Sequence, residues 1–88
     1  MAKLQIDNNQ SLSRFEASVN GKLAVLDYQV EGSTIFLLYV KVPEEEQGRG
    51  VASDLARAAL EFARDSRLAV VPRCPFIAAY ARRHPELL

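Results

Sequence analysis

The 88-residue sequence lacks an excess of charge, a long apolar run and a second cysteine. Its 11 basic and 11 acidic side chains cancel, so no overall field attracts a nucleic acid or an anionic membrane. The longest fully apolar run, residues 35–40, is far too short to span a bilayer, and the first residues lack the core of a signal peptide. The lone Cys74 allows no internal disulfide, which fits a reducing compartment. We therefore expect a soluble, cytoplasmic protein without a nucleic-acid or membrane partner.

The sequence also lacks a set of metal ligands and enough residues for a second core. The single histidine, His84, has no cysteine or carboxylate at ligand spacing, so no metal site is expected. With 49% hydrophobic residues the chain can bury one small core, and it is too short for two. The sequence thus predicts one domain over residues 1–88.

Two alternating stretches in the first half predict a β-hairpin. Polar and apolar residues alternate through residues 14–19 and again through residues 22–30, as in strands with one face on a core. Asn20-Gly21 separates them and accepts the positive φ angles of a tight type I′ turn. Residues 34–40 are apolar on both faces, which predicts an interior strand covered on both sides.

The second half alternates between helix and strand patterns. Apolar residues recur at helical spacing from Val51 onward, and residues 68–71 form a short apolar strand. Strand–helix–strand geometry makes that strand parallel to residues 34–40. A last helix begins at Pro75, whose φ is already helical, and ends before Pro85. The predicted fold is α/β (α+β), with a mixed sheet of antiparallel strands plus one parallel βαβ unit and two helices.

A glycine-rich turn joins residues 34–40 to the first predicted helix. The first N–H groups of a helix have no intrahelical partner and its dipole is positive there, so a phosphate is a natural ligand. A Walker A motif needs Lys-Ser/Thr after its last glycine, whereas Val51-Ala52 follows Gly50, and a dinucleotide fingerprint needs a third glycine. Both nucleotide motifs are therefore disfavoured, and a plain structural turn stays an alternative.

The hexapeptide Gln47-Gly48-Arg49-Gly50-Val51-Ala52 resembles the Gln/Arg-x-x-Gly-x-Gly/Ala motif of the GCN5-related N-acetyltransferases. In that family the amides of this motif bind the pyrophosphate of coenzyme A, so the resemblance implies acetyl-CoA as the cofactor. It assigns the pyrophosphate to Gln47, Gly48, Arg49, Gly50, Val51 and Ala52. It also implies that the backbone at the end of the preceding strand, including Val40 and Val42, pairs with the pantetheine arm, while these side chains fit a core equally well.

The tail Cys-Pro-Phe-Ile-Ala-Ala-Tyr-Ala-Arg-Arg-His-Pro-Glu, at residues 74–86, resembles the ending of the very small N-acetyltransferase domain-containing proteins of that family. Together with the turn, the resemblance covers roughly residues 13–88 and implies a minimal version of the family fold. Tyr39 stands where the family often has a His, and the tight Asn20-Gly21 connection leaves no room for the two-helix insertion of larger members. The acceptor-binding lid is then absent, and an open site suits an amine on a protein or a polyamine.

Two residues of the tail are candidates for catalysis. Cys74 precedes Pro75 at a helix N-terminus, where unpaired amides favour the thiolate, yet free cysteines are also commonly buried as small hydrophobes. Tyr80 would protonate the departing CoA thiolate, as a tyrosine does in many family members. It serves equally well as core packing in a stripe with Phe76 and Ile77.

Charged side chains beside the turn also have two interpretations each. Arg49 adds positive charge to the site or is a solvated surface residue. Three glutamates at residues 44–46 would repel a pyrophosphate unless they point into solvent, so a solvated run is expected. In the other interpretation one of them is a general base for the amine.

We therefore expect an acetyl-CoA-binding acyltransferase that moves an acetyl group to an amine. The alternatives are a non-catalytic module that binds CoA or acyl-CoA, and an interaction domain that has lost its ligand site. The first two differ in whether acetyl-CoA is consumed. The sequence does not identify the amine acceptor, the acyl-chain preference or the oligomeric state.

Overall fold

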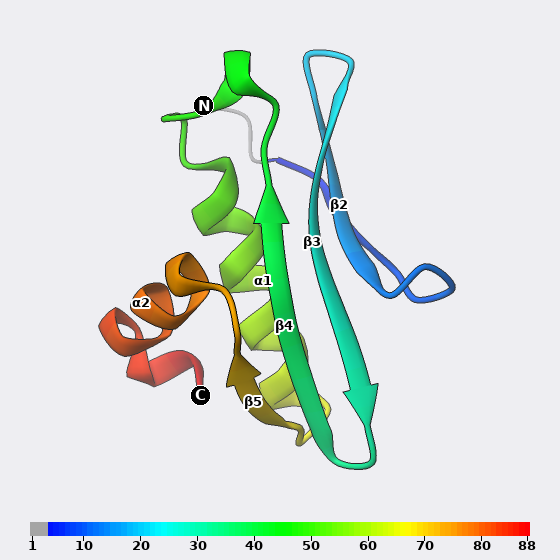
Figure 1. The fold of residues 1–88 in the computed structure, drawn as a ribbon, viewed down its shortest axis with the longest axis vertical. Coiled ribbons are helices and arrows are strands. Elements are labelled where there is room, and N and C mark those ends of the chain that lie inside the picture. The colour runs from blue at the N-terminus through cyan, green and yellow to red at the C-terminus, as the bar shows by residue number, and fades with distance from the viewer. Residues whose placement is uncertain (1–3) are drawn as a thin grey trace.

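Five strands form one mixed sheet in the computed structural model, which describes residues 4–88 (Figure 1). In sheet order, which is also chain order, they are β1 (Ile6–Asn9), β2 (Arg14–Val19), β3 (Lys22–Glu31), β4 (Thr34–Lys41) and β5 (Ala69–Pro72). The first four are antiparallel neighbours, and β5 pairs in parallel with β4. The predicted α/β class with one parallel βαβ unit is confirmed.

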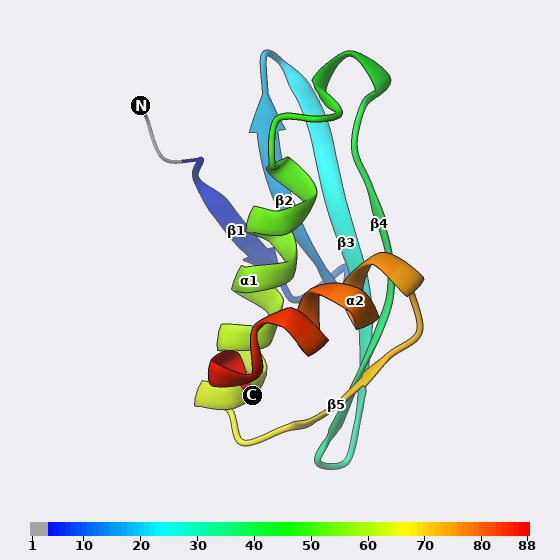
Figure 2. The same cartoon turned by 90° about the vertical axis from the view of Figure 1, so that its left-hand side faces the viewer.

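Two α-helices, α1 (Val51–Asp65) and α2 (Pro75–Arg83), pack on the same face of the sheet (Figure 2). The short 3-10 helix η1 (Glu44–Glu46) precedes α1, and a second one, η2 (Pro85–Leu87), follows α2. The side of α1 that faces the sheet is fully buried and rich in alanine, which lets the helix approach the strands closely. No helix within residues 4–88 is long and apolar enough to cross a membrane.

The β2–β3 hairpin has the predicted two-residue turn. Val19 pairs with Lys22, and between them Asn20 and Gly21 have φ angles of 51° and 76°. Positive φ at both positions is what a type I′ turn requires, so this prediction is confirmed. The predicted alternation fails only at Val30, which is exposed at the far end of β3.

Strand β1 is not apparent from the sequence. Ile6 is its one apolar residue, and the Asp and Asn residues that follow are poor strand formers. Two contacts hold this strand in place. Ala17 of β2 lies opposite Ile6, and the Tyr28 hydroxyl donates a hydrogen bond to Asn8 Oδ1 at 2.7 Å. Tertiary contacts therefore decide the conformation of this segment.

Strand β4 lies inside the sheet but is covered by helices on one face only. Ile35 and Leu37 are fully buried beneath the helices, whereas Tyr39 on the other face is 47% exposed. Phe36, also on that open face, is shielded by the Arg73 guanidinium, whose Cζ lies 5.3 Å from the ring centroid. The prediction of a strand covered on both sides is wrong, because both helices lie on the same face and side chains such as Arg73 shield the other.

The upper half of β4 extends beyond the end of β5. The last register pair is Leu37 with Pro72, and the Leu37 carbonyl accepts a hydrogen bond from Arg73 N at 2.9 Å. A β-bulge at Leu38 shifts the pairing with β3 at the same level. Past this point β4 has no strand on its β5 side, and the chain after β5 turns into α2 (Figure 1).

Candidate functional site

The turn before α1 presents backbone rather than side chains. Gly50 is the N-cap of α1 with φ 83° and ψ 8°, and Gly48 also has φ 83°, so both adopt the left-handed conformation that glycine accepts without penalty. Nothing lies within 4 Å of the position that a Cβ would occupy on either glycine. Conformation rather than crowding requires glycine here, and the space beside the backbone is open.

Three N–H groups at the start of α1 are free to bind a ligand. The first hydrogen bond of the helix runs from Asp54 N to Gly50 O at 3.0 Å. In the part of the chain that the structure describes, nothing accepts a hydrogen bond from the N–H groups of Val51, Ala52 or Ser53. The dipole of this 15-residue helix adds positive potential at the same end. The turn therefore has the elements of an anion site.

A cavity of about 290 Å³ borders this turn. Its walls come from the end of β4, from η1 and the turn, from the first turn of α1 and from the start of α2. The lining residues are Val42, Glu46, Gln47, Gly48, Gly50, Val51, Ala52, Ser53 and Phe76. Phe76 brings the first turn of α2 to the same cavity as the glycine-rich turn, whereas none of residues 72–75 lines it. We call this space the turn cavity.

The structure places the two polar side chains of the turn differently. Gln47 lines the turn cavity, and its Nε2 donates a hydrogen bond to the Val42 carbonyl at 3.2 Å, so this side chain ties the turn to the end of β4. Arg49 has a side chain that is 66% exposed, with Nε 3.8 Å from Glu46 Oε1. The positive charge of Arg49 therefore lies outside the lining of the turn cavity, beside the carboxylate of Glu46, which is part of that lining.

Glu46 is the one charged residue that is buried among residues 4–88, with 5% of its surface exposed. Its Oε1 accepts a hydrogen bond from Asn20 Nδ2 at 2.9 Å, at the tip of the β2–β3 hairpin. Next to it, Glu45 forms an ion pair with Lys22 of the same hairpin. The expectation of a solvated run is wrong for Glu46, because the hairpin tip packs against η1 and supplies a partner for its carboxylate.

Cys74 is the N-cap residue of α2 and is half-buried. It packs against the hydrophobic core and its side chain makes no capping hydrogen bond. Its carbonyl accepts a hydrogen bond from Ala78 N at 2.9 Å, and Pro75 occupies the first helical turn as predicted. Cys74 does not line the turn cavity, although Phe76, two residues later, does. Its chemical role stays a prediction.

Tyr80 is buried at the interface between α2 and α1, and it does not line the turn cavity. Its ring packs on His84, with ring centroids 4.3 Å apart. The Tyr80 phenol is the main cause that raises the pKa of Arg57 on α1, which places the hydroxyl near that guanidinium. The structure therefore does not bring Tyr80 together with the turn, and its role as a proton donor also stays a prediction.

Phe76 is a site residue that the sequence patterns assigned to the core. Ile77 and Tyr80 are buried as expected, whereas Phe76 is 36% exposed and lines the turn cavity. Phe76 lies about 100° around α2 from Ile77, and the rotation of α2 that buries Ile77 leaves Phe76 at the edge of the core. The sequence signal that could have identified Phe76 is its position directly after Pro75, at the start of a helix beside the strand ends.

Val40 lies near the end of β4 and Val42 just beyond it. Both side chains pack against the core. The backbone of residues 38–41 lies past the last hydrogen bond between β4 and β5, and an extended ligand can add to such an edge as a strand would. This free edge leads toward Val42, which lines the turn cavity.

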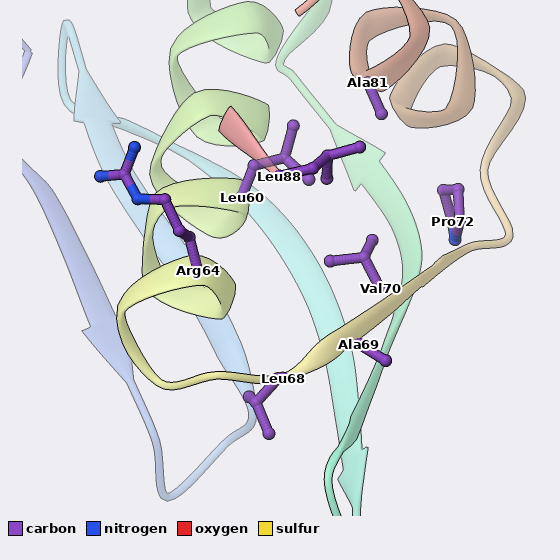
Figure 3. Close-up of a pocket in the computed structure, with 8 residues that line it drawn as sticks. All are labelled: Leu60, Arg64, Leu68, Ala69, Val70, Pro72, Ala81 and Leu88. Atoms are coloured by element: carbon purple, nitrogen blue, oxygen red, sulfur yellow. The ribbon is translucent and has the colours of Figure 1, made fainter. Parts of the chain in front are cut away.

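A second cavity of about 290 Å³ lies at the other end of α1 (Figure 3). It is lined by Leu60, Arg64, Leu68, Ala69, Val70, Pro72, Ala81 and Leu88. Figure 3 shows Val70 pointing toward Leu60 and Leu88, while the guanidinium of Arg64 points away from them. None of the predicted site residues lines this cavity, and its lining among the described residues is mostly apolar, with Arg64 as the one charged residue.

Comparisons with known proteins cover the residues of this site. A family model described as GCN5-related N-acetyl-transferase matches residues 14–88, which include the turn, the free edge of β4 and α2. Protein NATD1 of Gallus gallus is 33% identical over 85 residues, covering 93% of this chain and 77% of that protein. Protein NATD1 of Homo sapiens is 32% identical over 85 residues, with 93% and 75% covered. Protein NATD1 of Xenopus tropicalis is 30% identical over 87 residues, with 96% and 80% covered.

Proposed function

Because this chain belongs to the GCN5-related N-acetyltransferase family, whose activity is acetyl transfer, we propose that it binds acetyl-CoA and moves the acetyl group to an amine. The observation that carries the proposal is the turn cavity, where three N–H groups without acceptors adjoin two left-handed glycines. A pyrophosphate needs several donors within a small volume, and a helix N-terminus supplies them without side chains.

In this proposal the turn holds the pyrophosphate mainly through its backbone. The N–H groups of Val51, Ala52 and Ser53 donate to the phosphate oxygens, and Arg49 adds positive charge from outside. The carboxylate of Glu46 opposes binding, since it lines the same cavity. Its Oε1 is already bonded to Asn20 and lies 3.8 Å from Arg49 Nε, which reduces the repulsion.

The free edge of β4 would take the pantetheine arm. Val40 and Val42 anchor this segment in the core, so that its backbone is held in an extended form for main-chain hydrogen bonds. The edge ends at Leu37, where the hydrogen bonds to β5 begin. We propose that the acetyl end of the ligand is bound near this separation of β4 and β5.

Acetyl-CoA supplies an acetyl group as a thioester, which a neutral amine converts to an amide. The C–N bond forms and the C–S bond breaks, while the amine nitrogen loses one proton to water and the CoA thiolate takes up one proton. A backbone N–H of β4 would stabilise the negative charge that develops on the carbonyl oxygen. Tyr80 is proposed as the donor of the proton to the thiolate. Cys74 would shape the site in direct transfer, or accept the acetyl group first if transfer proceeds in two steps.

A non-catalytic CoA-binding module is the second candidate, and one observation favours it. Among residues 4–88, Glu46 is the one titratable side chain that lines the turn cavity, and Asn20 already binds it. The Tyr80 phenol lies near Arg57 rather than in that cavity. Under this alternative the protein binds acetyl-CoA and does not consume it.

Calorimetric titration with CoA and with acetyl-CoA, followed by a thiol-release assay with spermidine as acceptor, tests both candidates. Binding together with spermidine-dependent release of CoA thiol supports the acetyltransferase. Binding of both ligands without release supports the module. Absence of binding at millimolar ligand rejects both, because each requires the pyrophosphate site.

A further inference from the structure

The face of the sheet opposite the helices carries a row of four polar side chains. The strand registers place Asn9 opposite Arg14, Arg14 opposite Asp27, and Asp27 opposite Tyr39, so the row crosses β1 to β4. Both neighbours of Asp27 in β3 are buried beneath the helices, so the Asp27 side chain points to the open face. Ligands reach this row without passing either helix.

Two carboxylates flank the one positive charge of this row, because Glu16 lies beside Arg14 in β2 and Asp27 lies opposite Arg14 in β3. Arg14 Nε lies 2.5 Å from Glu16 Oε2, and the same oxygen accepts a hydrogen bond from Asn9 Nδ2 at 3.2 Å. Arg14, the one positively charged residue of the row, is therefore already paired with Glu16. Asp27 Oδ1 is shielded from solvent and has no hydrogen-bond partner among residues 4–88, the one buried side-chain nitrogen or oxygen there in that condition. Such an oxygen carries the cost of desolvation without a compensating donor.

Tyr39 borders Asp27 on the β4 side. Hydrogen bonding to the Asp27 carboxylate, and then the charge of that carboxylate, raise the pKa of the Tyr39 phenol. The hydroxyl therefore stays protonated at neutral pH and is available as a donor. A carboxylate has about four lone-pair sites, so one phenol leaves Asp27 with room for further donors.

The pair of Asp27 and Tyr39 lies beside the separation of β4 and β5. Tyr39 is two residues past Leu37, whose carbonyl accepts a hydrogen bond from Arg73 N. The β-bulge at Leu38 brings Tyr39 opposite Asp27. Because α1 and α2 cover the other face (Figure 2), an acceptor that approaches this separation passes over the face that carries Asp27 and Tyr39.

We propose that Asp27, with Tyr39 beside it, binds the ammonium group of the acceptor, which makes the acceptor a primary alkylamine that is positively charged in water. This inference rests on the proposed acetyl transfer. An ammonium group has three donors and one positive charge, which match the unpartnered oxygen and the unbalanced carboxylate. The ammonium releases one proton to water before its nitrogen attacks and a second one to water as the C–N bond forms, so Asp27 binds the acceptor and takes no proton in the reaction.

Titration of isotope-labelled, CoA-saturated protein with spermidine, followed by NMR, tests the binding directly. The backbone amides of Asp27 and Tyr39 should shift, and Asp27→Asn, which keeps the shape and removes the charge, should weaken the affinity about ten- to a hundredfold. Glu31→Gln removes the same charge from an exposed position of the same strand and should bind spermidine as the parent does. Equal affinity of the two variants, or shifts confined to other parts of the sheet, would overturn the proposal.

The same variants separate this inference from the proposed function. If CoA does not raise the melting temperature, acetyl transfer fails, and the spermidine titration without CoA still decides the role of Asp27. In the transfer assay Asp27→Asn should raise KM for spermidine about tenfold or more and change kcat little. KM for aniline, which is neutral at neutral pH, should not change. A fall of kcat with both amines would show a structural role and contradict the proposal.

A lysine-containing peptide in place of spermidine identifies the source of the ammonium group. Asp27-dependent binding of the peptide assigns the site to a protein side chain, and Asp27-dependent binding of spermidine alone assigns it to a free polyamine. Binding of neither amine would overturn the proposal. Tyr39→Phe, which removes the hydroxyl and keeps the Asp27 charge, should weaken binding less than Asp27→Asn.

Discussion

Asn20 at the tip of the β2–β3 hairpin donates a hydrogen bond to Glu46 across 26 residues of chain, with Nδ2 2.9 Å from Oε1. This contact joins the predicted hairpin turn to the predicted phosphate turn, and the sequence patterns do not connect the two. Asn20 is therefore needed twice, once for its positive φ and once for its side chain. The position of the phosphate turn depends on the hairpin.

Replacing Glu46 should reveal this coupling as a loss of stability. Glu46→Ala leaves the Asn20 amide without its acceptor and should lower the free energy of unfolding by about 1–3 kcal/mol, measured by urea denaturation. Glu44→Ala, at an exposed position of the same 3-10 helix, should change it by less than about 0.5 kcal/mol. Glu46→Gln keeps an oxygen acceptor and removes a negative charge from the turn cavity, so it should not weaken CoA binding. Equal stability of the two alanine variants would show that the Asn20 contact contributes nothing.

Cys74 should react faster with iodoacetamide than free cysteine does at neutral pH, and CoA should slow the reaction. Its place at the N-cap of α2 exposes the thiol to unpaired amides and the positive end of the dipole. We expect direct transfer, because a cysteine thioester offers no large driving force over CoA itself. Cys74→Ala should therefore keep most of the activity. A hydroxylamine-labile acetyl adduct that is absent from Cys74→Ser, together with loss of transfer in that variant, would establish the two-step route instead.

Tyr80→Phe separates the proposed proton donor from core packing, since it removes the hydroxyl alone. If Tyr80 donates the proton to the thiolate, kcat should fall by about a hundredfold or more while the affinity for CoA is unchanged. We expect the melting temperature to change little, because the ring contact with His84 is kept. An unchanged kcat with a lower melting temperature would mean that Tyr80 is a packing residue.

The fold could be predicted wherever local patterns and tertiary packing agree. The Asn20-Gly21 turn, the helical spacing after Val51 and the strand–helix–strand order each specify one local outcome, and the structure has all three. β1 could not be predicted, because its four residues carry a weak strand pattern and are held by β2 and by the Tyr28 hydroxyl. Segments stabilised by distant partners leave little trace in their own sequence.

The residues of the candidate site could also be predicted only in part. The two glycines and the helix start could be found because a left-handed N-cap needs glycine. Burial of Glu46 and exposure of Phe76 could not, because each depends on which element packs beside it. The open face of β4 was also missed, since a run of apolar residues does not tell whether helices or an arginine side chain cover it.

Thermal melting of the protein with acetyl-CoA, with two variants at Gly50 that match in size and differ in charge, tests the central claim most directly. At about a hundred times the dissociation constant, CoA and acetyl-CoA should each stabilise the parent by about 2.7 kcal/mol, which raises the melting temperature by roughly 10 °C or more. Gly50→Asn tolerates the left-handed conformation and adds no charge, so part of the shift should remain, whereas Gly50→Asp places a negative charge at the phosphate site and should abolish it. No shift for the parent at millimolar ligand, or an equal shift for Gly50→Asp, would contradict the account.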